Sequence, residues 1–367
     1  MLEPRLTRLF QAMRGLGLEA IALNPGPTLF YLTGLTFHLM ERPVIALFTL
    51  DHQPCLVLPD LERARAEATQ GLDLLSYGEA EASRLEVMQR ACARVGLPGR
   101  RIGVEPLRFR VYELRLLEQS SPGSRVVSAE GALGPLRLTK DEGEMAHIRQ
   151  AIAIAEGALA ATLPSIRAGM TERELASELT LQLLRAGSDP ELPFPPIVAA
   201  GPNSALPHAV PGDRPLARGD LLILDWGASY RGYISDLTRT FAVGEADAEL
   251  GRVHEIVQQA NAAGRWAVMP EGTCGGVDQA ARAVIAASGY GDYFTHRTGH
   301  GIGLEAHEPP YIRGDNGERL LPGMVFTVEP GIYLPGRGGV RIEDNMLVTS
   351  EGGESLTSFP RLLKVVG

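Results

Sequence analysis

The sequence predicts an α+β protein of two domains, a smaller N-terminal α/β domain over residues 1–132 and a larger domain over residues 133–367. The length of 367 residues exceeds that of most single domains. In the first third of the chain, strand-like apolar runs alternate with helical patterns, as in α/β domains. The remainder twice repeats an order of two helices followed by strands, and the turn-forming stretch Gly131-Ala-Leu-Gly-Pro135 precedes it.

The elements of the N-terminal domain follow from hydrophobic periodicity. Apolar residues such as Leu6, Leu9 and Met13 recur at helical spacing, and two apolar runs flank Asp51-His-Gln-Pro54, a hairpin signal. The predicted helices cover residues 3–17, 60–70, 79–95 and 109–119, and the predicted strands cover residues 20–23, 43–50, 54–58, 72–75, 101–104 and 125–128. Nothing in this domain resembles a catalytic constellation.

Capping boxes mark the first two helices of the larger domain. Thr139-Lys-Asp-Glu142 predicts the start of a long helix, and Thr171-Glu-Arg-Glu174 predicts the start of a second helix that stops at Gly187. A further long and short helix pair is predicted over residues 248–268 and 277–288. We therefore expect two related halves, each a helix pair packed on antiparallel strands.

Composition limits the function classes. The chain has 35 Lys and Arg against 44 Asp and Glu, for a net charge of −9, which argues against nucleic-acid or membrane-surface partners. No apolar run approaches the roughly 20 residues that span a bilayer, and the mixed-charge N-terminus is unlike a secretory signal. The three cysteines, Cys55, Cys92 and Cys274, share no metal-binding spacing. They are expected to be buried thiols of a cytoplasmic protein.

The hairpin Leu221–Phe241 carries two acidic residues in an otherwise apolar pattern. If its turn centres on Tyr230 and Arg231, then Asp225 and Asp236 lie directly opposite each other. Opposed residues in an antiparallel pair have Cβ atoms about 5 Å apart, and like charges there destabilise the sheet. A nearby arginine, Arg231 or Arg239, could compensate the charge, but divalent metal ions bind carboxylates better.

Three further stretches place polar residues where a core would exclude them. The segment from His296 to Glu308 holds three histidines among glycines. Glu329 ends one apolar strand and Glu343 lies inside another, and carboxylates are rarely buried without a partner. With the hairpin acids and His300, these residues suit two divalent ions of the Mn, Co or Zn kind.

The combined motifs resemble those of the metallopeptidases with the pita-bread fold, the group that holds creatinase, prolidase, aminopeptidase P and methionine aminopeptidase. The resemblance runs from about residue 135 to the C-terminus. It rests on Asp225 with Asp236 eleven residues later, His296-Arg-Thr-Gly-His-Gly-Ile-Gly303, Val328-Glu-Pro-Gly331 and Val340-Arg-Ile-Glu-Asp344. The N-terminal domain, with Asn-Pro-Gly-Pro-Thr-Leu-Phe-Tyr-Leu-Thr-Gly at 24–34, resembles the creatinase N-terminal, ribonuclease H-like domain of the Xaa-Pro branch.

This resemblance implies a role for each matching position. The implied metal ligands are Asp225, Asp236, His300, Glu329 and Glu343, which would hold two divalent ions, with manganese expected and cobalt or zinc as alternatives. A hydroxide between the ions would attack the scissile carbonyl, with Glu329 as general base. His208, in a segment that resembles the family's proton-handling one, and His307 would stabilise the oxyanion or pass protons. His296 and Arg341 would bind the substrate near its carboxylate end.

Alternatives remain for several of these residues. His208 follows Pro207 and could be an ordinary loop histidine. Arg341 could pair with a metal-ligand carboxylate, and this would not exclude substrate binding. Arg42, in a polar loop of the N-terminal domain, could bind the carboxylate of a dipeptide and exclude longer peptides, although a solvated loop arginine is the simpler interpretation.

The resemblance implies an Xaa-Pro dipeptidase, active as a homodimer on Xaa-Pro dipeptides or peptides. One alternative is aminopeptidase P, which releases the N-terminal residue of longer Xaa-Pro peptides and shares the same ligands. A different class, a binding protein that uses the fold without catalysis, would have lost metal ligands, as would a metal-free hydrolase of the creatinase type. The sequence keeps all five ligand positions.

Overall fold

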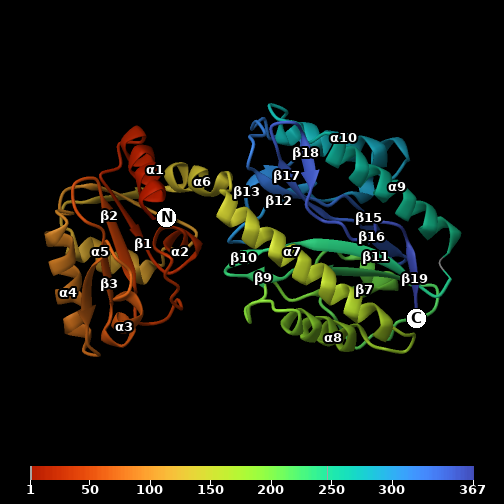
Figure 1. The fold of residues 1–367 in the computed structure, drawn as a ribbon, viewed down its shortest axis with the longest axis horizontal. Coiled ribbons are helices and arrows are strands. Elements are labelled where there is room, and N and C mark those ends of the chain that lie inside the picture. Colours follow the sequence, from red (N-terminus) through yellow and green to blue (C-terminus); the bar gives the residue numbers. More distant parts are fainter. Residues whose placement is uncertain (1, 246) are drawn as a thin grey trace. The chain divides into compact units, whose positions relative to one another are not determined.

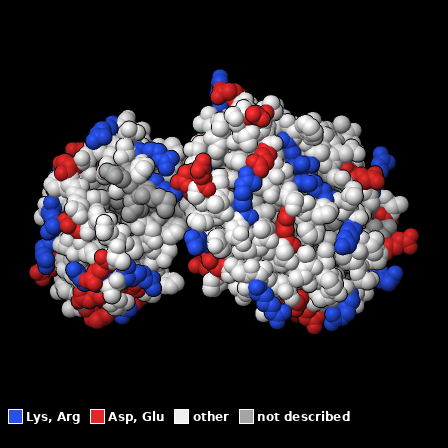
Figure 2. Space-filling model, viewed as in Figure 1, with Lys and Arg blue, Asp and Glu red and all other residues white. Residues whose placement is uncertain are grey.

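The computed structural model describes residues 2–245 and 247–367, which form two compact units, Met1–Arg137 and Leu138–Gly367 (Figure 1). The predicted domain boundary at 132/133 falls inside helix α6 (Glu130–Leu138), so the stretch predicted as a turn is helical and contains Pro135. On the face that Figure 2 shows, acidic and basic side chains intermingle on both units. Among the described residues, no helix combines the length and the apolar character needed to cross a membrane.

The first unit is a six-stranded mixed sheet with the strand order β4-β3-β2-β1-β5-β6. All six predicted strands form: β1 (Ala20–Leu23), β2 (Ile45–Thr49), β3 (Cys55–Pro59), β4 (Asp73–Tyr77), β5 (Arg101–Val104) and β6 (Arg125–Ser128). The helices are α1 (Leu2–Gly15), α2 (Pro27–Thr33), α3 (Arg63–Ala66) after the 3₁₀ turn Asp60–Glu62, α4 (Glu81–Arg94) and α5 (Val111–Ser120). Helix α2 was not predicted, because seven residues are too few for a periodic signal.

Two helix pairs support the second unit, as the repeat predicted. Helices α7 (Glu142–Thr162) and α8 (Glu172–Arg185) pack together, and so do α9 (Ala248–Trp266) and α10 (Cys274–Ala287). The capping box of α8, between Thr171 and Glu174, is confirmed. The one predicted for α7 is wrong by two residues: Asp141 caps the helix with Glu144, because Thr139 forms a β-bridge with Met324 and the backbone N–H of Lys140 donates to the carbonyl of Gly323.

The strands of the second unit form two larger sheets and two ribbons. The sheet order is β19-β11-β8-β7 in one and β13-β12-β14-β17-β18 in the other, with the ribbons β9–β10 and β15–β16. The strands are β7 (Ile197–Ala200), β8 (Leu221–Trp226), β9 (Ser229–Tyr230), β10 (Tyr233–Ile234), β11 (Leu237–Val243), β12 (Gly299–Gly301), β13 (Glu308–Ile312), β14 (Val325–Val328), β15 (Gly331–Leu334), β16 (Gly338–Arg341), β17 (Asp344–Val348), β18 (Gly353–Ser355) and β19 (Lys364–Val366).

The hairpin turn lies one residue later than predicted. Arg231 and Gly232 are its two central residues and have φ of 52° and 79°, the left-handed pair that a tight hairpin favours. This shifts the pairing by two residues, so that Asp225 faces Thr238 instead of Asp236. The predicted direct opposition of the two acids is therefore wrong.

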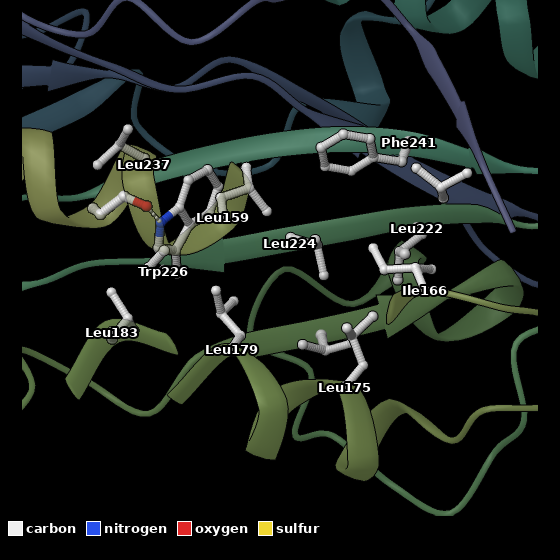
Figure 3. Close-up of a cluster of buried hydrophobic side chains, with 14 of the residues drawn as sticks. Leu159, Ile166, Leu175, Leu179, Leu183, Leu222, Leu224, Trp226, Leu237 and Phe241 are labelled. Carbon is white, nitrogen blue, oxygen red and sulfur yellow. Dashed lines mark hydrogen bonds between the residues drawn. The ribbon is translucent and has the colours of Figure 1, made fainter. Parts of the chain in front are cut away.

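Strand β8 has one face in a hydrophobic core and the other toward the acidic residues. Leu222, Leu224 and Trp226 pack among the side chains of α7, α8 and β11 (Figure 3). The Trp226 indole N–H donates to the carbonyl of Ala155, 2.9 Å away, so its only polar group is paired in the core. Since side chains alternate along a strand, the packing of this face turns Asp225 to the opposite face.

Candidate metal centre

Three buried side chains from distant segments converge in the second unit. Asp236 precedes β11, His300 lies in β12 and Glu343 precedes β17. Each offers one ligand atom such that all three atoms lie within 4.8 Å of one another. Glu329, which follows β14, joins them because its Oε1 lies 3.2 Å from His300 Nε2. Four of the five predicted metal ligands thus share one buried site.

Asp225, the fifth predicted ligand, approaches the site from β8. Its Oδ2 accepts a hydrogen bond from Arg341 Nη2 at 2.5 Å, within a buried ion pair. Its Oδ1 is buried and has no hydrogen-bond partner among the described residues. A buried carboxylate oxygen without a partner is costly, so this atom needs a ligand.

Most carboxylates of this site resist ionisation. Burial, and then the negative charges of Glu343, Asp225 and Glu329, raise the pKa of Asp236 well above its usual value. Burial, and then Glu329 and Asp225, do the same to the pKa of Glu343. The exception is Glu329: burial opposes its ionisation, but the hydrogen bond and charge of His300 outweigh burial and lower its pKa to about 2.

These residues fit divalent metal ions. The donor set is four carboxylates and one imidazole, the ligands that Mn, Co and Zn accept. A cation in the site would remove the repulsion that raises the pKa values of Asp236 and Glu343. It would also give the unpaired Oδ1 of Asp225 a partner. The donor set and the unpaired buried oxygen of Asp225 therefore both indicate that this site is suited to divalent cations.

Arg341 is the buried cation nearest to these acids. Besides Asp225, its guanidinium donates to Thr238 Oγ1 at 3.1 Å, to the Tyr333 hydroxyl at 2.8 Å and to the carbonyl of Pro207 at 3.3 Å. A guanidinium has five N–H donors, so one remains. This geometry supports the alternative in which Arg341 holds a ligand carboxylate, and it leaves no bidentate face for a substrate carboxylate.

His296 continues this network on the far side of Tyr333. Its Nε2 lies 2.8 Å from the Tyr333 hydroxyl and its Nδ1 lies 2.7 Å from the carbonyl of Arg297. Because the carbonyl can only accept, Nδ1 carries the proton and Nε2 accepts from Tyr333. Burial lowers the pKa of His296, which agrees with a neutral ring.

The two predicted proton-handling histidines differ in their surroundings. His307 packs against His300 with ring centroids 4.1 Å apart, and burial, followed by the charge of His300, lowers its pKa to about 4. It is therefore neutral near pH 7. His208 is exposed, in the segment after the 3₁₀ turn Gly201–Ala205, and the carbonyl of the preceding residue, Pro207, accepts from Arg341 at 3.3 Å.

Comparison with known proteins places the chain in a family. Metallopeptidase family M24 matches residues 146–350, and the Creatinase/Prolidase N-terminal domain matches residues 5–139. The chain belongs to metallopeptidase family M24. This confirms the predicted fold class, a pita-bread domain preceded by a creatinase N-terminal domain, and it shows that the protein is a peptidase of a family that uses divalent metal ions.

Similar proteins cover the whole length of this M24 peptidase. It is 31% identical over 367 residues to the Xaa-Pro dipeptidase of Pyrococcus horikoshii, with 99% of each chain covered. The prolidase of Thermococcus sibiricus superimposes with a TM-score of 0.95 and 31% identity over 100% of this chain and 99% of its own. The X-Pro aminopeptidase of Thermotoga maritima gives 0.87 and 32%, over 98% of this chain and 99% of its own.

The arginines proposed from the sequence to offset the hairpin charge do not do so in this M24 peptidase. Arg239 pairs with Asp344, 2.9 Å away, and Arg231 lies over the Tyr230 ring. Arg42, in the first unit, contacts Glu41 and Glu79 at 3.2 Å each.

Three residues of the site escaped sequence reasoning. Tyr333 joins Arg341 to His296, and Thr238 donates to Glu343 Oε2 at 2.6 Å. The side-chain amide of Asn345 accepts from the backbone N–H of Asp236 and donates to the backbone carbonyl of the same residue. Tyrosine and threonine are ordinary strand residues, so nothing in the sequence marks the first two. Asn345, directly after the acidic pair, was the only one with a visible signal.

Proposed function

We propose that this M24 enzyme is an Xaa-Pro dipeptidase that works with two divalent metal ions per chain. The observation that carries the proposal is the convergence of four carboxylates and His300 on one buried site, where, among the described residues, Arg341 is the one arginine that pairs with a carboxylate of the site. One cation would leave carboxylates in mutual repulsion. The substrate class is supported by the prolidase and Xaa-Pro dipeptidase among the similar proteins.

The proposed ligands are Asp225, Asp236, His300, Glu329 and Glu343. Bound metal ions would polarise the scissile carbonyl and make a water molecule nucleophilic near neutral pH. Manganese is the proposed ion, with cobalt or zinc as alternatives, because all three accept this mixture of oxygen and nitrogen donors. Metal analysis of the purified protein should give two ions per chain.

Glu329 is the proposed general base, because its carboxylate lies in the site beside His300, with Oε1 3.2 Å from Nε2, and because the family resemblance implies this role. His307, neutral near pH 7, can donate a hydrogen bond to the oxyanion that forms on the scissile carbonyl. His208 would donate a hydrogen bond to the same oxyanion from its exposed loop. For Arg341 we propose the supporting role at Asp225. His296 would meet the carboxylate end of the substrate only after giving up one of its two present hydrogen bonds.

The deciding experiment compares Xaa-Pro dipeptides with Xaa-Pro-Xaa tripeptides, using protein loaded separately with Mn, Co and Zn. A higher kcat/KM on the dipeptide supports the proposal. A higher value on the tripeptide would instead support aminopeptidase P, which the similarity to the Thermotoga maritima X-Pro aminopeptidase favours. Hydrolysis of neither substrate by protein carrying two metals would contradict both Xaa-Pro activities.

Arg42 is the proposed determinant of substrate length, because it lies in a loop and because a guanidinium can bind a substrate carboxylate with two parallel hydrogen bonds. Loss of a hydrogen bond to a charged group costs about 1.5–3 kcal/mol, or roughly ten- to a hundredfold. Arg42→Ala should therefore move the kcat/KM ratio toward the tripeptide. Arg63→Ala, which likewise removes an arginine of the first unit that pairs with a glutamate, is the control, and an equal ratio in both variants would exclude Arg42 as the determinant of substrate length.

We further propose a homodimer located in the cytoplasm. The three free, buried cysteines support a reducing compartment, and the dimer follows from the family resemblance. Sedimentation of the purified protein should give twice the chain mass of 39.4 kDa.

A further inference from the structure

One buried carboxylate of the second unit lies outside the metal site and has no part in the proposed chemistry. Glu172 is the first residue of α8, and it is 1% exposed. It is not needed as a helix cap, because Thr171 and Glu174 already form the capping box. A buried carboxylate is costly unless it is well hydrogen-bonded, so its partners indicate what it does.

Among the described residues, the hydrogen bonds of the Glu172 carboxylate all go to the segment Ala200–Gly212, which carries His208. Its Oε1 accepts from the backbone N–H of Ala200 at 2.8 Å, and its Oε2 accepts from the backbone N–H of Gly212 at 3.1 Å. The side-chain amide of Asn203 donates to both oxygens, at 3.1 Å each. Ala200 begins this segment and Gly212 ends it, so one carboxylate binds both ends.

The backbone around Glu172 reinforces this attachment. Its own N–H donates to the carbonyl of Arg214 at 3.1 Å, and that of Arg173 donates to the carbonyl of Gly212 at 3.0 Å. The Arg214 guanidinium itself is paired with Asp220, at 2.7 and 3.0 Å. Among the described residues, the carboxylate of Glu172 is therefore hydrogen-bonded by neutral N–H groups, in charge-assisted bonds of the stronger kind.

The middle of the same segment is attached to strand β16 and the residues of the metal site. The Ser204 hydroxyl accepts from the backbone N–H of Gly339 at 2.8 Å, and the carbonyl of Pro207 accepts from Arg341. His208 itself is exposed. Its position therefore depends on a segment that Glu172 fixes at the ends and β16 fixes in the middle.

We propose that Glu172 is a positioning residue for His208. The carboxylate closes the segment Ala200–Gly212 on α8 and thereby fixes the backbone beside His208, whose preceding residue, Pro207, contacts Arg341 of the metal site through its carbonyl at 3.3 Å. This inference rests on the proposed function of His208. Misplacement of a catalytic group by about 1 Å can cost roughly a hundredfold in rate.

The test is Glu172→Gln, which keeps the side-chain volume but turns an amide N–H toward at least one backbone donor. We expect kcat to fall by roughly ten- to a hundredfold, with KM within about threefold and metal content unchanged. Glu174→Gln, in the same helical turn but exposed, is the matched control and should keep the wild-type kcat. Backbone amide exchange at Ala200 and Gly212 should accelerate in Glu172→Gln and not in the control.

A double variant separates positioning from general destabilisation. In a His208→Ala background, Glu172→Gln should lower kcat little further, because the group it positions is already gone. Fully additive losses, or an unchanged kcat in Glu172→Gln, would overturn the inference. If Glu172→Gln does not fold, Asn203→Ala removes the amide that donates to both carboxylate oxygens and leaves the carboxylate in place. It should show the same dependence on His208 with a smaller loss of kcat.

The same set distinguishes failure of this inference from failure of the proposed function. If His208→Ala lowers kcat and Glu172→Gln does not, only the positioning role falls. If His208→Ala leaves kcat unchanged, the proposed role of the histidine falls and the positioning role falls with it. If neither Xaa-Pro substrate is cleaved by metal-loaded wild type, the proposed function fails before either variant is considered.

Discussion

Two neighbouring residues, Glu343 and Asp344, belong to buried clusters of opposite charge balance. Glu343 faces the metal site, where four carboxylates meet one arginine, Arg341. Asp344 faces three arginines, within 2.7 to 3.6 Å. The arginines of this second cluster are Arg239, Arg265 and Arg361.

The pKa values follow this difference. The pKa of Glu343 is raised well above its usual value, first by burial and then by neighbouring carboxylates. Burial acts on Asp344 as well, but the charge of Arg239 and the hydrogen bond and charge of Arg361 outweigh it and lower its pKa to about 2. Burial alone therefore does not decide the state of a carboxylate. The Asp344 cluster obtains its positive charge from the chain itself, whereas the metal site lacks it and is suited to bind a cation.

The largest expected effect is on activity, through Asp236. Asp236→Asn removes a proposed metal ligand, and activity should fall by orders of magnitude, beyond the roughly 10–100-fold typical of residues that only support ligands. The metal-free variant should be at least as stable as metal-free wild type, because the change removes repulsion. Asp315→Asn, on the surface, is the control. Near-normal activity with two metals bound would contradict the ligand assignment.

Asp344→Ala should act on stability instead. Three arginines would lose their buried carboxylate, and breaking a buried ion pair costs about 3–5 kcal/mol. Urea unfolding followed by tryptophan fluorescence measures this loss, because both tryptophans, Trp226 and Trp266, lie in the second unit. Asp315→Ala, which breaks an exposed pair with Arg313, should cost about 1 kcal/mol or less. Equal midpoints for the two variants would show that the clusters do not differ in this way.

Metal ions should stabilise the protein by binding at the metal site that contains Glu343, and not at the arginine cluster around Asp344. A ligand at 100 times its Kd adds about 2.7 kcal/mol to the stability of the state that binds it. Adding Mn to metal-free protein should therefore raise the thermal midpoint of wild type and raise that of Asp236→Asn much less. Adding Mn should also raise the thermal midpoint of Asp344→Ala, although that variant starts from a lower midpoint than wild type. A uniform response in all three proteins would indicate binding elsewhere.

The comparison also shows what the sequence could predict. Glu329, Glu343 and the hairpin acids stand out because each is a carboxylate in an apolar run, and the flanking motifs identify the family. The Asp344 cluster has no such signal, since Arg239 and Asp344 are 105 residues apart along the chain. The sequence instead offered Arg239 as a partner for the hairpin acids, but residue 239 pairs with Leu224 and lies on the opposite face from Asp225.

The hairpin error has a local cause. A two-residue turn with both φ positive tolerates Gly well, and Gly232 occupies its second position. Centring the turn on Gly232 and its predecessor gives the observed register. The role of Glu172 was hidden for a different reason: its partners Ala200 and Gly212 are backbone groups, which a sequence does not distinguish.

The smallest expected effect is on the pH dependence of stability, through His254, which lies near Arg239 of the Asp344 cluster. Burial, and then the charge of Arg239, lower the pKa of His254 from 6.5 to about 4. The unfolded chain then binds a proton more readily than the folded one, so the contribution of His254 is fully present above pH 6.5 and is lost as pH falls toward 4. Between pH 7 and pH 5 the loss is about 2 kcal/mol. His254→Gln should flatten the pH dependence of unfolding by this amount over that interval, whereas His52→Gln, on the surface of the other unit, should not. Parallel pH profiles for wild type and His254→Gln would show that burial and the charge of Arg239 do not lower the pKa of His254 in the folded protein.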